Sequence, residues 1–307
     1  MFRLNSSIAF VILISIYIIS LLFSAYQTGI LWVSLFFIIL SISITVSTVK
    51  TMSLQSFGAK WNEYPISVLM IVIGALITFN LVKFQMSAVL ASSLVGIFGS
   101  LTLKRYETEI FTGSFVGMSS VVLFSDAGIL VASVVAAVIY LSGKNVFVGI
   151  GGKLGSSAFI GTALVALAVG KNVWNPDISV INTSLPLWFY VVTAVLSALA
   201  SVMTHQIAQK YLKGSVVLGS SIIGALGYAL SFAFGPLSGL FAGTIFAASF
   251  AGMSQKRVLK SPHYFVIAGM ITAMIFLASS TYFLGLGGKM GTSAFIAVLA
   301  VTVLIKD

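Results

Sequence analysis

Apolar runs the length of a membrane-spanning helix follow one another along almost the whole chain, separated by short polar or glycine-bearing stretches. A helix needs roughly 20 apolar residues to cross a bilayer. Charged residues make up only 7 % of the chain, where a soluble domain carries roughly 25 %. The sequence therefore predicts an all-α integral membrane protein. It excludes a soluble domain, and it also excludes a disordered chain, which needs low hydrophobicity and high charge.

We expect twelve transmembrane segments in one membrane domain, and two of them, 110–125 and 239–255, are weaker because they are rich in glycine and serine. These two are expected to be broken or partly re-entrant helices. The twelve lie near 8–25, 30–48, 66–82, 87–103, 110–125, 128–142, 153–170, 186–208, 215–234, 239–255, 264–284 and 289–305.

Residue types that carry enzymatic chemistry are scarce in this chain. It has no cysteine, which excludes disulfides, thiolate metal ligands and thiol nucleophiles. No HExxH motif, carboxylate dyad or Ser/His/Asp constellation is visible. We therefore expect no catalytic residues, no metal and no cofactor. The acidic residues are expected in loops or at span ends: Glu63, Glu107, Glu109, Asp126, Asp177 and Asp307.

An internal duplication divides most of the chain into two halves. FVGIGGKLGSSAFI at 147–160 matches FLGLGGKMGTSAFI at 283–296, with 10 of 14 positions identical. Two further pairs occur in the same order, IFTGSFVGMS with IFAASFAGMS and VLASSLVGIFG with VLGSSIIGALG. The matches predict repeat 1 over 64–170 and repeat 2 over 184–307, each with five segments. An N-terminal transmembrane hairpin over 1–50 precedes them.

An odd number of spans per repeat predicts that the second repeat is inverted relative to the first. The positive charges agree with this topology when the N-terminus is cytoplasmic, because 13 of the 16 Lys and Arg residues then fall on the cytoplasmic side, as the positive-inside rule requires. Both termini are therefore expected in the cytoplasm, and the protein in the cytoplasmic (inner) membrane. The formal charge of +10 is explained by this sidedness, so nucleic acid is not an expected partner. The 13 are Arg3, Lys50, Lys60, Lys104, Arg105, Lys144, Lys153, Lys210, Lys213, Lys256, Arg257, Lys260 and Lys306.

Inverted repeats are typical of transporters and channels, whose sites lie where broken helices of the two halves meet. The motif G-G-K-x-G-[ST]-S stands before the last segment of each half and predicts two symmetric half-sites. Its glycines permit unwound backbone, its hydroxyls are expected to cap the following helix, and its lysine beside a helix N-terminus favours anions. The alternative is a capped glycine turn with a lysine that reaches the headgroups. The motif residues are Gly151, Gly152, Lys153, Gly155, Ser156, Ser157, Gly287, Gly288, Lys289, Gly291, Thr292 and Ser293.

The paired SFVGMS and SFAGMS segments supply a second candidate site, with Ser114 and Phe115 matching Ser249 and Phe250. The hydroxyls could line a narrow pore, with the two phenyl rings as slots or gates that reject hydrated ions. The alternative is close helix packing through small residues. Packing is also the interpretation of a third pair, Ser92–Ser93 with Ser220–Ser221.

The layout of two inverted five-span halves resembles the urea transporter family. GSFVGMSSVVLFSD at 113–126, after the glycine-rich ASSLVGIFGSL, resembles its glycine-bearing segments between the second and third spans of a half. The family's Leu-Pro-x-x-Thr-x-Pro-Phe motif is absent, and GGKLGSSAFI and GGKMGTSAFI stand in the comparable place. The resemblance implies a passive pore in each protomer and a homo-oligomer, a trimer by analogy.

These features predict a transporter or channel that passes a small polar or anionic solute, with membrane lipid as its other partner. Two alternatives stay open: a non-transporting scaffold or assembly subunit, and a membrane enzyme that acts on a lipid-linked substrate. An enzyme should carry its polar residues in one half only, whereas the polar motifs here are matched between the halves.

Overall fold

The computed structural model describes residues 2–28, 31–53, 64–171 and 185–305, and in these ranges the chain is helical with no strand. Lys60, Glu63, Asp177, Lys306 and Asp307 lie outside the described residues. The α-helices are α1 (Phe2–Thr28), α2 (Leu31–Ser53), α3 (Tyr64–Lys83), α4 (Ala88–Thr102), α5 (Glu107–Gly117), α6 (Asp126–Ser142), α7 (Lys153–Ala168), α8 (Leu187–Lys210), α9 (Val216–Ser231), α10 (Ser238–Gly252), α11 (Pro262–Ala278) and α12 (Lys289–Thr302). Two short 3-10 elements, Lys104–Tyr106 and Phe232–Leu237, precede α5 and α10.

Five helical stretches of the described chain are long and apolar enough to cross a membrane: Ser7–Tyr26, Val33–Lys50, Tyr64–Lys83, Leu187–Lys210 and Val216–Gly252. Several other apolar helices are shorter than a full span. The 11 residues of α5 extend only about 16 Å at 1.5 Å per residue, roughly half of a bilayer core. The expected segment 110–125 is thus a short helix that ends at Gly117, followed by turns.

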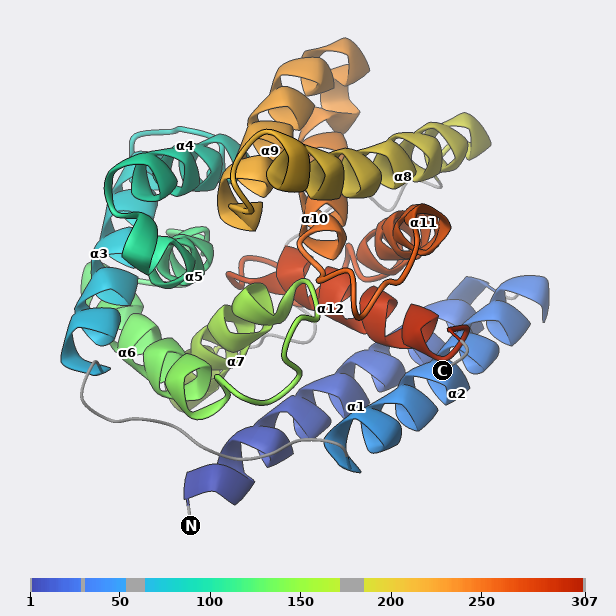
Figure 1. The fold of residues 1–307 in the computed structure, drawn as a ribbon, viewed down its shortest axis with the longest axis horizontal. Coiled ribbons are helices and arrows are strands. Elements are labelled where there is room, and N and C mark those ends of the chain that lie inside the picture. Colours follow the sequence, from blue (N-terminus) through green and yellow to red (C-terminus); the bar gives the residue numbers. More distant parts are fainter. Residues whose placement is uncertain (1, 29–30, 54–63, 172–184, 306–307) are drawn as a thin grey trace.

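The helices form two groups with the hairpin along one edge (Figure 1). Helices α3 to α7 lie on one side and α8 to α11 on the other, while α12 runs between them and the α1–α2 hairpin. The groups meet where α4 packs on α9, and α12 packs on α7 of one group and on α10 of the other. Within the first group, α5 packs on α3, α4 and α7. Within the second, α10 packs on α8 and α9. This arrangement places α5 and α10 at the centre, and nearly every side chain of α10 from Phe241 onward is buried.

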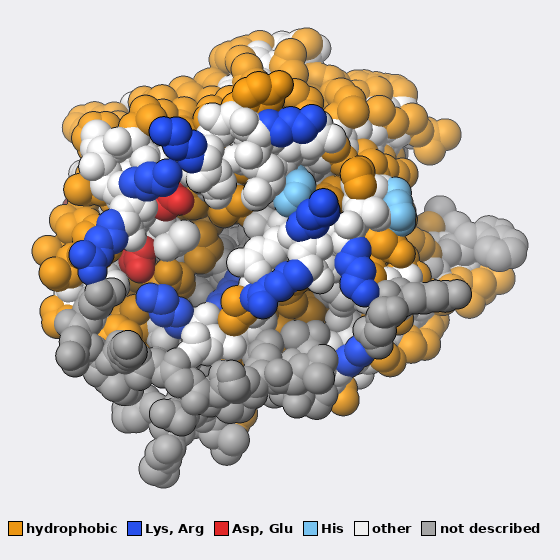
Figure 2. All heavy atoms as spheres, in the orientation of Figure 1, with side chains coloured by type: hydrophobic (Ala, Val, Ile, Leu, Met, Phe, Trp, Pro, Cys, Tyr) orange, Lys and Arg blue, Asp and Glu red, His pale blue; other side chains and the backbone are white. Residues whose placement is uncertain are grey.

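Surface side chains separate by type on the face shown in Figure 2. Lys and Arg side chains gather over its middle, and apolar side chains occupy much of its upper and right-hand rim. Large apolar side chains are also exposed along α1, α2, α8 and α11, where lipid would cover them.

Helix α1 joins the two groups through two buried aromatic side chains. The Phe10 ring lies 5.7 Å from that of Phe147 and 5.6 Å from that of Phe295. The Tyr17 ring lies 5.9 Å from that of Phe159 and 5.5 Å from that of Phe283. Phe10 and Tyr17 therefore each contact one ring from each half of the chain. Such aromatic pairs contribute about 0.5–1.5 kcal/mol beyond their buried area.

The α1 contacts also hold two strained loop residues. Phe147 and Phe283 have positive φ values of 52° and 56°, a conformation that costs of order 1–3 kcal/mol for a residue other than glycine. Both side chains are buried against α1. Packing on the hairpin therefore stabilises the loop before α7 and the loop before α12 together.

Substituting Phe10→Ala should lower the free energy of unfolding by about 3–5 kcal/mol, the range for a buried phenyl ring. The loss should exceed that of Tyr26→Ala, because the Tyr26 side chain is 80 % exposed on the same helix. Thermal unfolding of both variants in detergent measures the difference. Equal unfolding temperatures would mean that the hairpin does not stabilise the rest of the protein.

Candidate functional site

The glycines of the two G-G-K motifs form a close crossing between the first turns of α7 and α12. Gly152 and Gly288 cap these helices with φ values of 81° and 85°, a left-handed conformation that favours glycine. Gly155 and Gly291 meet so closely that a Cβ on Gly155 would lie 2.7 Å from the Cα of Gly291. The two helix N-termini therefore contact each other backbone to backbone.

Each glycine motif is bound to the serine-rich segment of the opposite half. The backbone N–H of Gly151 donates to Ser254 Oγ at 3.0 Å, and the N–H of Gly287 donates to Ser119 Oγ, also at 3.0 Å. The same bond thus occurs twice with the halves exchanged. It joins α7 to the C-terminal end of α10, and α12 to the C-terminal end of α5.

Four phenylalanines from α5 and α10 form a buried ring cluster: Phe111, Phe115, Phe246 and Phe250. Every pair of rings is in contact, with centroid separations from 4.4 Å for Phe111–Phe115 to 6.4 Å for Phe115–Phe246. Most of the pairs have an edge-to-face geometry, which aromatic rings prefer. The cluster contains two residues from each half and lies between them.

Serine hydroxyls pair beside the ring cluster in the same way in both halves. Ser92 Oγ and Ser114 Oγ lie 2.8 Å apart, and so do Ser220 Oγ and Ser249 Oγ. Each bond ties α4 to α5 or α9 to α10. Ser114 and Ser249 are therefore part of matched buried hydroxyl pairs.

A second pair of buried hydroxyls lies where α4 crosses α9. Ser93 Oγ and Ser221 Oγ have no hydrogen-bond partner among the described residues. A Cβ on Gly96 would lie 2.1 Å from Ser221 Oγ, and one on Gly224 would lie 2.5 Å from Ser93 Oγ. A buried unsatisfied polar group costs about 1–3 kcal/mol. These hydroxyls are therefore retained at an energetic cost next to the phenyl rings.

The first-turn hydroxyls of α7 and α12 do not cap their helices, so that expectation is wrong. The caps are Gly152 and Gly288, with no side-chain cap bond. Each hydroxyl lies one turn inside the helix and donates to the carbonyl four residues earlier, at 3.2 or 3.3 Å. This holds for Ser156, Ser157, Thr292 and Ser293.

The two motif lysines bind the ends of the preceding helices. Lys153 Nζ donates to the carbonyl of Lys144 at 3.0 Å, just after α6. Lys289 is buried, and its Nζ donates to the carbonyls of Ser279 and Tyr282, just after α11. A cation at a helix C-terminus satisfies free carbonyls and interacts favourably with the helix dipole.

Substituting Lys289→Met should destabilise the protein by about 1–3 kcal/mol, because buried carbonyls lose their donor. Lys153→Met should cost less, since Lys153 is half-buried and binds a single carbonyl. Thermal unfolding in detergent ranks the two variants. An equal or reversed ranking would contradict the role of burial in these contacts.

Glu109 is more buried than the sequence indicates. It lies in the first turn of α5, and its side chain is only 5 % exposed. Thr108 Oγ1 donates to its Oε2 at 2.8 Å, and Ser67 Oγ donates to its Oε1 at 3.5 Å. The positive end of the α5 dipole also favours this carboxylate. In the described chain no three His, Asp or Glu side chains gather to hold a metal ion.

The structure brings the sixteen predicted site residues into one central region, and all except Lys153 are buried. The two lysines differ from the predicted anion half-sites, because their amines bind loop carbonyls. Sequence reasoning missed Phe111 and Phe246, which complete the ring cluster. The signal was available, since both stand at matching places in the IFTGSF and IFAASF strings.

Comparisons with family models, with curated proteins and with solved structures found no match for this chain.

Proposed function

We propose that the chain is a membrane channel or transporter that passes a small polar or anionic solute passively, through a path between two inverted five-segment repeats. The observation that carries the proposal is a pair of Gly–Ser hydrogen bonds, each 3.0 Å long, in which each half donates to the other. Both bonds lie beside the four-ring cluster. A twofold relation between the halves would produce such an exchange. A twofold relation of this kind would present equivalent half-sites to the two sides of a membrane. This suits a protein that passes a solute across the membrane, whereas an enzyme that works from one side has no use for it.

The proposed path runs past the unsatisfied hydroxyls of Ser93 and Ser221 and through the phenyl cluster. The hydroxyls offer hydrogen bonds to a solute that has lost its water. The rings would exclude hydrated ions and admit flat solutes when they rotate. The rings are in contact with one another, so the proposed path would be closed in this conformation.

The proposal includes twelve transmembrane segments in the inner membrane, with both termini in the cytoplasm. It also includes a homo-oligomer in which each protomer has a urea-transporter-like pore. The half-length helix α5 fits a broken segment that is supported by protein rather than lipid. Because the chain has no cysteine, single cysteines can be introduced without background. Lys104→Cys and Ala233→Cys should react with a membrane-impermeant maleimide from opposite faces, and labelling from the same face would exclude the inverted topology.

Solute entry into proteoliposomes tests the function directly. Vesicles with the protein should admit at least one of urea, formamide, glycerol, formate and nitrate faster than protein-free vesicles. Absence of both accelerated entry and counterflow for every solute would refute transport and favour a scaffold subunit. Lys153→Gln then distinguishes the two lysine hypotheses: a selective loss of formate and nitrate entry indicates an anion half-site, and an equal loss for all solutes indicates a structural cap.

A further inference from the structure

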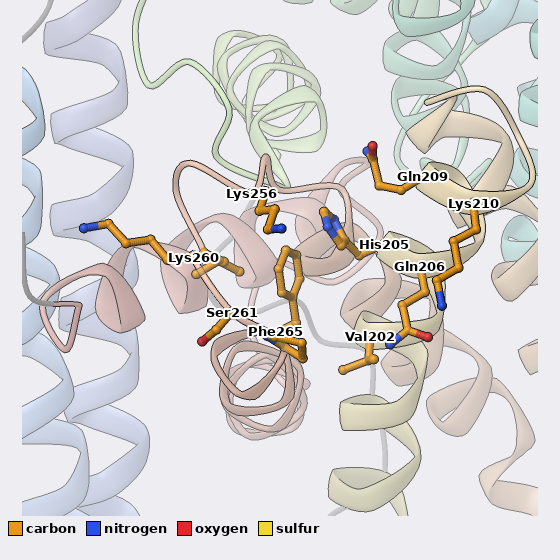
Figure 3. Close-up of a pocket in the computed structure, with 11 residues that line it drawn as sticks. Val202, His205, Gln206, Gln209, Lys210, Lys256, Lys260, Ser261 and Phe265 are labelled. Carbon is orange, nitrogen blue, oxygen red and sulfur yellow. The ribbon is translucent and has the colours of Figure 1, made fainter.

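A pocket of about 440 Å³ opens between the end of α8, the loop after α10 and the start of α11 (Figure 3). Its polar lining comes from His205, Gln206 and Lys210 on α8, and from Lys256 and Lys260 on the loop. Lys256 and His205 lie near each other at the inner side of the pocket in Figure 3. None of the described residues that line it is acidic. The described lining therefore makes a concave site to which Lys210 and Lys256 bring positive charge.

The pocket has an apolar floor. The Phe265 ring is buried and lies against His205, with centroids 4.1 Å apart and the ring planes tilted by 31°. Pro262 is the first residue of α11, and Ser261 before it makes no side-chain cap bond. The N-terminus of α11 therefore adds its partial positive charge to that of the lysines. Lysines, a helix N-terminus and an apolar floor together suit a phosphate group on an apolar stem.

The first half provides an internal comparison for this corner. A Cβ on Gly117 would contact Thr78, and one on Gly252 would contact Thr204. The two threonines are therefore equivalent in the paired SFxG contacts, and so are the residues that follow them.

The equivalent corner of the first half has different residues. His205 corresponds there to Phe79, which is buried. The first residue of α6 is Asp126 where α11 has Pro262, and Asp126 forms an ion pair with Lys83 at 2.9 Å. At this corner the second half thus has Pro262 where the first half has an acid, and Lys210 and Lys256 lie beside it.

An exposed apolar stripe leads away from the pocket along both helices. On α11, Val266 and Met270 follow Pro262 at helical spacing and are 36 % and 39 % exposed. On α8, Leu199 and Met203 precede Gln206 on the same face and are 51 % and 44 % exposed. Residues four apart share a helix face. An acyl chain lying on this stripe would place its phosphate in the pocket.

We propose that this pocket binds a phosphate-bearing anion, and that the apolar stripe favours a phosphate carried on a membrane lipid. Basic pockets between transmembrane helices are suited to anionic headgroups, and each lysine near such a surface contributes about 1 kcal/mol. The site lies outside the ring cluster, so it does not require that the protein transport a solute. It assigns a specific ligand to charges that the positive-inside rule would otherwise explain by orientation alone.

The test compares Lys210→Gln/Lys256→Gln with Lys104→Gln/Lys213→Gln, a matched pair of exposed lysines outside the pocket. Native mass spectrometry in a neutral detergent gives the apparent Kd for short-chain phosphatidic acid and for phosphatidylcholine of the same length. Wild type should bind phosphatidic acid at least about tenfold more tightly. The pocket pair should lose about that factor, while the outside pair keeps it.

Calorimetry with inorganic phosphate distinguishes the two sources of the ligand. Phosphate binding as tight as that of phosphatidic acid, and weakened by the same pocket pair, would identify free phosphate. Tight binding of the lipid alone would identify a headgroup. The proposal fails if the pocket pair binds phosphatidic acid as wild type does, or if the outside pair weakens it equally. Size-exclusion chromatography of both double variants confirms that they remain folded.

Discussion

Substituting Phe250→Ala should raise solute entry into proteoliposomes by at least about tenfold, which requires the barrier to fall by only about 1.4 kcal/mol. Phe250 contacts all three other rings of the cluster, with centroids 4.5, 4.9 and 6.0 Å away. Removing this ring opens a space in the middle of the cluster, on the path that we propose for the solute. Stopped-flow light scattering with a neutral solute and with formate measures the change.

The matched control for this prediction is Phe98→Ala, because the Phe98 side chain is 64 % exposed on α4. Its removal should leave solute entry unchanged. Since a buried Phe→Ala substitution costs about 3–5 kcal/mol, Phe250→Leu serves as a second, milder variant with a smaller increase. Folded Phe250 variants with unchanged entry would remove the ring cluster from the path.

Substituting Gly155→Ala should abolish or strongly reduce folded protein. The new methyl group would lie 2.7 Å from the Cα of Gly291 and 3.1 Å from the carbonyl oxygen of Gly288. Backbone atoms on the opposite helix cannot move aside as a side chain can, so α7 and α12 would have to separate. Small residues at helix crossings are needed for this reason. The yield of monodisperse protein and its unfolding temperature measure the loss.

Gly239→Ala is the control for this substitution. A Cβ at Gly239 meets no atom within 4 Å, and its φ is not positive. Alanine also favours a helix over glycine by about 1 kcal/mol, so this variant should be as stable as wild type or slightly more so. A well-folded Gly155→Ala protein would show that the α7–α12 crossing is looser than described here.

The sequence predicted which segments are helical far better than it predicted where they end. Each expected segment corresponds to one helix of the structure. The helix of the segment 110–125 ends at Gly117, where a broken helix was expected, and the residues after it bond to the other half. Ser119 accepts the N–H of Gly287, and the N–H of Ser120 donates to the carbonyl of Gly285 at 2.9 Å. The hydropathy pattern depends on local sequence and gives no information about such distant partners.

The duplication identified residues that the structure brings together, because matching contacts in the two halves leave matching residues. It did not predict that Gly155 contacts its own counterpart Gly291, since a contact across the repeats has no sequence spacing of its own. It also misassigned the helix caps, because a left-handed glycine and a serine can both start a helix. The burial of Glu109 was missed because an acid in a first turn is ordinarily solvated.

If the chain passes a solute as we propose, the docking of α1 against both halves bears on the kinetics of that passage. Phe10 and Tyr17 each touch one ring from either half, so a rocking motion of one half against the other would break at least two aromatic contacts at once. Domain motions of that kind take microseconds to milliseconds, whereas side chains change rotamer far faster. A clamped scaffold with mobile rings would let each protomer conduct at a rate set by side-chain rotation, with no conformational cycle to reset between one solute molecule and the next.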